Sequence, residues 1–210
     1  QRDKLRTEVH VRHADAPKGS DLAFMKLPVV WWCFAFFLLS TMTLAVVQTF
    51  APSILTAVHG VSVEVATLTI SAYMLCSALG MLVGGCVAAR SSHSDRVVGW
   101  SMGSGAVLML VCATAWLGGA GTMVLLALTG FAVGIGGPSR DMMIRKATPK
   151  GATGRVYGTV YSGLDVGFAI SPLVFGALMD RGWYALTLAG AAVILFISVY
   201  AAVGVGRRTV

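Results

Sequence analysis

Six apolar segments dominate this sequence, and each approaches or reaches the length that a helix needs to cross a lipid bilayer. A transmembrane helix takes roughly 20 residues to span about 30 Å of hydrocarbon. The segments cover residues 27–50, 66–89, 97–117, 122–143, 156–178 and 183–205. Because lipid offers no hydrogen bonds to the backbone, a segment of this length must be helical. The sequence therefore predicts an all-α membrane protein with six transmembrane helices.

The fourth segment carries the weakest signal of the six. Its apolar part ends near Ile135, and the run Gly-Gly-Pro at 136–138 follows before Arg140 and Asp141. Glycine and proline both weaken a helix. We therefore expect an interruption near residue 138, of the kind that borders binding sites in membrane bundles.

Composition argues against a soluble globular domain. The chain is 56% apolar and only 12% charged, whereas soluble domains contain about 25% charged residues. The sequence has no nucleotide-binding lysine loop and no His/Cys/carboxylate cluster at metal spacing. The four cysteines lie far apart within apolar segments, where we expect them to pack as small apolar residues. We expect a non-enzyme with no catalytic residue, no metal and no cofactor.

The basic residues indicate how the helices are oriented. If residues 1–26 lie on the inner side, every Lys and Arg except Arg181 falls on that side. Inner loops of membrane proteins carry an excess of Lys and Arg, so both termini are expected in the cytoplasm. The charge is spread between apolar segments, which argues against a nucleic-acid partner. We expect residues 1–26 to be a solvated cytoplasmic segment and residues 207–210 to be a short tail.

A short sequence pattern occurs twice, at the ends of the second and fifth segments. The copies are ALGMLVGGCVAAR at 78–90 and AISPLVFGALMDR at 169–181, and in each a glycine precedes the final arginine by five residues. The charge-based topology places the two ends on opposite faces of the membrane. Residues 27–117 and 122–205 are therefore predicted to form an inverted repeat of three helices each, which is typical of secondary transporters.

Three motifs resemble a known transporter family. Residues 85–92 are similar to the loop motif Gly-x-x-x-Asp-Arg-x-Gly of the major facilitator superfamily, with Ala89 replacing the aspartate and Ser92 the second glycine. Residues 167–176 resemble the family's helix motif Gly-x-x-x-Gly-Pro-x-x-x-Gly, and residues 138–155 resemble its cytoplasmic link between helices ten and eleven. The chain thus resembles the C-terminal six of the family's usual twelve helices, closest to its bacterial, fosmidomycin-resistance-like efflux members.

The resemblance implies a second six-helix half, supplied by the same parent chain or by a second copy, with residues 1–26 belonging to the loop between the halves. It implies that the first, second, fourth and fifth helices border a central cavity, while the third and sixth lie outside. Because Ala89 replaces an acid, Asp95 and Arg96 are the alternative charge pair of the inner loop. The residues that the loop motifs assign to gating are Gly85, Arg90, Asp95, Arg96, Arg140, Asp141, Asp180 and Arg181.

Asp165 is the strongest functional candidate. It lies nine residues into the fifth segment, about 14 Å from the boundary and hence near the midplane. An ionised aspartate at that depth costs about 2.5–3.5 kcal/mol, so such residues line a cavity or find a partner. Tyr161 and Ser162 are the nearest partners along the helix, and a second half or protonation are the alternatives. A carboxyl that takes up a proton as the cavity opens to either side would couple transport to protons; a structural aspartate that ties helices together is the alternative reading.

Other polar groups within the segments are candidates for contacts with a substrate or for ordinary hydrogen bonds between helices. These cavity candidates are Gln48, Ser71, Tyr73 and Tyr161. Small residues at about four-residue spacing in the fifth segment predict close helix packing, as small-x-x-x-small faces do in membranes. The packing candidates are Gly163, Gly167, Ser171, Pro172 and Gly176.

The sequence therefore favours one half of a secondary transporter that moves a small molecule across the bilayer by alternating access. A proton gradient or the substrate's own gradient would drive it. Two alternatives remain open at this point: a six-helix membrane scaffold or interaction subunit without transport, and a half-size transporter that works as a homodimer.

Overall fold

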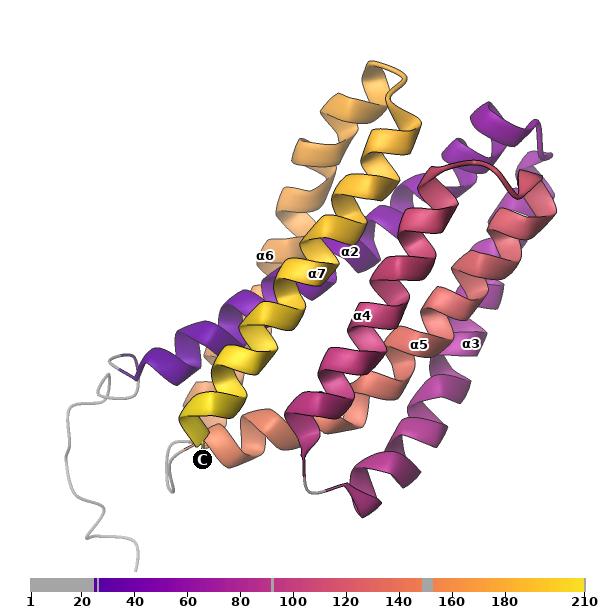
Figure 1. The fold of residues 1–210 in the computed structure, drawn as a ribbon. Helices are drawn as coiled ribbons and strands as arrows, with labels where there is room; N and C mark the ends of the chain where they lie inside the picture. The colour runs from indigo at the N-terminus through magenta and orange to yellow at the C-terminus, as the bar shows by residue number, and fades with distance from the viewer. Residues whose placement is uncertain (1–24, 26, 92, 149–152, 210) are drawn as a thin grey trace, which may run out of the picture.

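The chain folds into one bundle of long helices (Figure 1). The computed structural model describes residue 25 and residues 27–91, 93–148 and 153–209. The helices are α2 (Pro28–His59), α3 (Val63–Arg90), α4 (Ser94–Ala113), α5 (Gly118–Ala147), α6 (Thr153–Asp180) and α7 (Tyr184–Thr209). All six are long and apolar enough to cross a membrane, and the described residues contain no strand. The prediction of an all-α protein with six membrane-spanning helices is confirmed.

Two helices end elsewhere than the sequence indicates. α2 continues beyond residue 50 through Pro52 to His59, because Ala51, Ile54 and Leu55 are buried in the core and hold these turns in place. The helix stops at Gly60, whose φ of 65° is left-handed and whose N–H donates to Thr56 O. Glycine takes up this conformation at helix ends without strain. At the other end of the chain, α7 runs on to Thr209 and includes residues assigned above to a tail.

The expected interruption of the fourth helix is wrong. α5 continues through Pro138 to Ala147, although Figure 1 shows it bending in its last turns, as a proline inside a helix causes. Packing between α4 and α5 explains why position 136, two residues before the proline, is a glycine. A Cβ on Gly136 would clash with the Ser101 side chain of α4, so this position must be small for α4 and α5 to meet.

The helix pairing has the pattern of an inverted repeat. α3 packs mainly on α5, and α6 packs mainly on α2. α4 also packs on α5, α7 also packs on α2, and α4 and α7 pack on one another. Exchanging α2, α3 and α4 for α5, α6 and α7 reproduces each of these pairs. The six helices therefore pack with the symmetry of the predicted inverted repeat, with α4 and α7 lying across α5 and α2.

Backbone contact joins α3 to α5. Two glycines on each helix face a main-chain carbonyl of the other helix so closely that no Cβ fits between them. The glycine–carbonyl pairs are Gly80 with Phe131, Gly84 with Ile135, Gly130 with Tyr73 and Gly134 with Ser77. We call these four glycines the α3–α5 seam. In lipid, small residues let helices approach and gain van der Waals contact that the hydrophobic effect does not supply.

A second seam joins α6 to α2. A Cβ on Gly163 would lie 2.8 Å from Phe34 O, and one on Gly167 would lie 2.7 Å from Leu38 O. One turn further, the Ser171 hydroxyl donates to Met42 O at 3.0 Å. These three residues, the α2–α6 seam, occupy the small positions that the sequence pattern indicates.

Two other members of that pattern lie away from the seam. Pro172 is exposed, and a Cβ on Gly176 would meet nothing within 4 Å. Neither residue therefore takes part in the contact between α6 and α2 at this seam. They are off the seam because the helix turns about 100° per residue, so a spacing of five residues from Ser171 to Gly176 moves the position to another face.

The α3–α5 seam predicts that alanine substitutions at two neighbouring glycines affect the free energy of unfolding differently. Gly84→Ala should lower the free energy of unfolding by about 1–3 kcal/mol, because its Cβ would lie only 2.9 Å from Ile135 Cα. Gly85→Ala is the matched control, since nothing lies within 4 Å of its Cβ, and its stability should be unchanged or higher by up to about 1 kcal/mol. Thermal unfolding in detergent measures both. Equal effects of the two substitutions would contradict the seam.

Candidate functional site

One face of α6 carries three polar side chains in a row. Tyr157, Tyr161 and Asp165 follow one another at intervals of four residues, and this spacing places them on the same side of a helix. The rings of Tyr157 and Tyr161 stack with centroids 5.8 Å apart. Asp165 lies two residues from both Gly163 and Gly167, so it points to the side of α6 opposite the α2–α6 seam.

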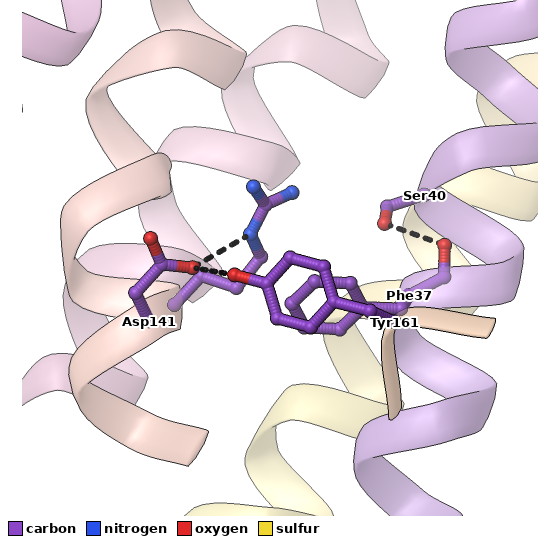
Figure 2. A network of polar contacts seen from close by, with 5 residues as sticks. Phe37, Ser40, Asp141 and Tyr161 are labelled. Atoms are coloured by element: carbon purple, nitrogen blue, oxygen red, sulfur yellow. Dashed lines mark hydrogen bonds and ion pairs between the residues drawn. The ribbon is translucent and has the colours of Figure 1, made fainter. Parts of the chain in front are cut away.

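A polar cluster forms where this face of α6 meets α2 and α5 (Figure 2). The Tyr161 hydroxyl donates to Asp141 Oδ1 at 3.4 Å. Asp141 Oδ1 also lies 3.8 Å from Arg140 Nε, and the Arg140 guanidinium sits over the Phe37 ring at 4.7 Å from its centroid. The Phe37 and Tyr161 rings are 5.2 Å apart. We call Phe37, Arg140, Asp141 and Tyr161 the α5–α6 cluster.

The charges of this cluster differ in their access to solvent. The Arg140 side chain is 23% exposed and the Asp141 side chain 52% exposed. Arg140 Nε is buried and has no hydrogen-bond partner among the described residues, since 3.8 Å to Asp141 is an ion pair and too long for a hydrogen bond. The Phe37 ring also stabilises the Arg140 charge, because a guanidinium over an aromatic face is attracted to its electron density. The more accessible group of the pair is the Asp141 carboxylate.

Arg140 lies deeper in the bundle than the sequence indicates. Because α5 continues to Ala147, Arg140 is seven residues, or about 10 Å, from the end of its helix. Its partner, Phe37, belongs to none of the sequence motifs. No local pattern could identify it, because the two residues are brought together only by the packing of α5 beside α2.

Asp165 makes no hydrogen bond or ion pair with the described part of the chain, and its residue is exposed. The expected partners along α6 are both engaged elsewhere. Tyr161 donates to Asp141, and Ser162 donates to Thr159 O at 2.7 Å. Of the alternatives that the sequence leaves open, pairing of Asp165 with Tyr161 or Ser162 is thus not seen in this structure. Asp165 lies about 18 Å from the start of α6, close to the middle of that helix.

The remaining cavity candidates are dispersed. Gln48 on α2 contacts Met74 Sδ of α3 at 3.9 Å, and Ser71 is exposed on α3. Tyr73 is only 3% exposed, and its ring packs against Gly130 in the α3–α5 seam. Tyr73 is thus a core residue that no solute can reach in this conformation. The structure groups Tyr161 with Asp165 and separates both from Gln48, Ser71 and Tyr73.

The loop residues assigned to gating do not form charge pairs beyond Arg140–Asp141. Among the described residues, Arg90, Asp95, Arg96 and Asp180 make no ion pair. Arg181 lies over the Trp183 ring at 5.3 Å from its centroid instead of pairing with Asp180. Gly85 has open space on its Cβ side, and Ser92 lies outside the described residues. The described residues also contain no group of three or more His, Cys, Asp or Glu side chains that could hold a metal ion.

Comparison with known proteins identifies one family. The family model described as Major Facilitator Superfamily matches residues 30–209, which include all six helices except the first two residues of α2. No curated protein matches the chain in sequence.

The α5–α6 cluster predicts an energetic coupling between Tyr161 and Asp141. In a double-mutant cycle of Tyr161→Phe and Asp141→Asn, the coupling should be about 0.6 kcal/mol, the average for hydrogen bonds between transmembrane helices. The matched control is a cycle of Tyr157→Phe and Asp141→Asn, because Tyr157 stacks on Tyr161 but makes no hydrogen bond to Asp141. Reversible unfolding in mixed micelles gives the four free energies of each cycle. Equal coupling in both cycles would contradict the cluster.

Proposed function

The chain belongs to the major facilitator superfamily, and from this premise we propose that it is one six-helix half of a secondary transporter that moves a small molecule by alternating access. Membership of the family makes it an integral membrane protein of a transporter family. The distribution of Lys and Arg supports a bacterial inner membrane, with the end of the bundle that carries Arg90, Arg96 and Arg155 facing the cytoplasm.

The unpaired Asp165 carries the proposal. Its carboxyl is exposed halfway along a membrane-spanning helix and has no partner among the described residues. Ionised and facing lipid, it would cost about 2.5–3.5 kcal/mol. That cost is avoided if this face of α6 borders a water-filled cavity or a second helical bundle. The exposed Asp141 carboxylate and the Tyr161 hydroxyl lie along the same face, one to two turns nearer the cytoplasmic end.

The proposed role of Asp165 is proton coupling. A carboxyl without an ion-pair partner can hold a proton in one conformation and release it when the cavity opens to the other side. The Tyr161–Asp141–Arg140 arrangement contributes a hydroxyl donor, an accessible carboxylate and a shielded guanidinium next to it. We propose that Tyr161 and Asp141 contact the solute, because they are the accessible polar groups of this face.

A second bundle supplies the other wall of the cavity in this proposal. α3 and α6 contain the smallest share of buried residues of the six helices. They carry exposed large side chains, including Leu68, Leu75 and Leu82 on α3 and Phe168 and Leu173 on α6. α4 and α7 lie across the opposite side of the bundle. The second bundle would belong to the same parent protein or be a second copy of this chain.

Asp165→Asn should abolish coupling while leaving the fold intact. The protein, with its second bundle, would be reconstituted in vesicles that contain a pH-sensitive dye and challenged with a panel of small organic solutes. The wild type should move protons when at least one solute is added, and Asp165→Asn should reduce that rate at least about tenfold, since a step that loses about 1.4 kcal/mol of stabilisation slows tenfold. Glu64→Gln, at the exposed start of α3, is the matched carboxyl control. Wild-type proton movement by Asp165→Asn would exclude this role.

A single bundle is not expected to transport. The 21.9 kDa chain should show no solute flux as a monomer, because one wall does not close a cavity. Light scattering in detergent gives the mass of the particle, and the same preparation is then tested for flux in vesicles. A particle of twice the chain mass that transports would favour the homodimer. Flux by a monomer would contradict the need for a second bundle.

A further inference from the structure

A long groove lies between α4 and α7, on the side of the bundle away from the proposed transport face. Its volume is about 1040 Å³. One face of α4 forms one wall, from Asp95 to Leu108, and α7 forms the other with Phe196, Val199 and Val203. Neither the α5–α6 cluster nor Asp165 borders this groove, so the proposed transport function does not account for it.

The length of the groove fits one leaflet of a bilayer. From Asp95 to Leu108, α4 rises about 20 Å. Half of a hydrocarbon core of about 30 Å is about 15 Å, so the groove runs from the level of the lipid headgroups to about the middle of the membrane. Its two ends therefore meet different environments, one polar and one apolar.

The walls match these two environments. Along its length the groove is apolar, formed by Gly99, Gly103 and Val107 on α4 opposite the α7 side chains. A Cβ on Gly103 would meet nothing within 4 Å, so the absence of side chains at these glycines is what keeps the groove open. The Ser104 hydroxyl on this wall already donates to Ser101 O at 2.9 Å. The apolar part thus has no polar group in need of a ligand.

The charged end of the groove offers a guanidinium. Arg96 is exposed and makes no ion pair within the described residues. Its neighbour Asp95 lies in the first turn of α4, where the positive end of the helix dipole offsets a negative charge. The Arg96 charge lacks such an offset. A guanidinium at the depth of the headgroups binds a phosphate through two parallel hydrogen bonds.

We propose that this groove is a specific binding site for a phospholipid, with one acyl chain lying along Gly99, Gly103 and Val107 and the phosphate on Arg96. The site would hold one lipid with saturable affinity, unlike the lipids that surround any membrane protein. The charge on Arg96 selects for the phosphate, and the groove space along Gly99 and Gly103 accommodates the acyl chain.

Native mass spectrometry of the detergent-purified chain tests the site with two probes that share their acyl chains. Dioleoyl phosphatidylglycerol carries the phosphate, and dioleoylglycerol lacks it. The wild type should bind one phosphatidylglycerol about tenfold more tightly than dioleoylglycerol, as expected for hydrogen bonds to a charged group. Arg96→Gln should remove this preference. Gly103→Leu should weaken the binding of both probes, because the new side chain occupies the groove at a position where its Cβ has open space.

Gly176→Leu is the matched control, since it adds the same side chain at another open glycine. It should bind both probes like the wild type. Circular dichroism and the melting temperature establish that each variant is folded, and a misfolded Gly103→Leu would be replaced by Gly103→Val. Equal binding of the two probes by the wild type, or wild-type binding by both Arg96→Gln and a folded Gly103 variant, would overturn the proposal.

Discussion

Direct backbone contact between helices is the constraint on which this structure depends. In water, apolar faces drive helices together, but lipid is as apolar as the side chains, so packing itself must supply the attraction. The α3–α5 seam brings the two main chains together at Gly80, Gly84, Gly130 and Gly134. The α2–α6 seam does the same with two glycines and a serine hydroxyl. Each seam joins one helix of the first repeat to one helix of the second, so the inverted repeat is held together at these contacts.

The seams also determine which residues remain available. Gly163 and Gly167 turn one side of α6 toward α2, which leaves Asp165 on the opposite side. The continuation of α5 beyond Pro138 brings Arg140 and Asp141 beside α6. Arg140 is then shielded by Phe37, whereas both carboxylates stay accessible. Acidic groups that face outward from a membrane helix need a polar surrounding, which is why a cavity or a second bundle follows from this arrangement.

The two sides of the bundle suit different surroundings. The proposed transport face is lined by carboxylates and tyrosines along α6 and the end of α5. The opposite side, formed by α4 and α7, carries an apolar groove with one arginine at its end. In the proposed arrangement, a lipid on the α4–α7 side would not obstruct the solute path. It would lie against α4 and α7, which pack on α5 and α2. α5 and α2 are also the helices that the two seams join to α3 and α6.

Hydropathy and charge distribution were enough to predict the six helices, the membrane setting and the repeat, because each segment carries these properties on its own. The sequence did not determine where α2 ends or that α5 continues through Pro138. It also offered Tyr73 as a cavity residue and Tyr161 as a partner of Asp165, whereas Tyr73 is buried against Gly130 and Tyr161 donates to Asp141. These points depend on the packing of helices that are far apart in the chain. No local pattern specifies which helices meet or how each is rotated about its axis.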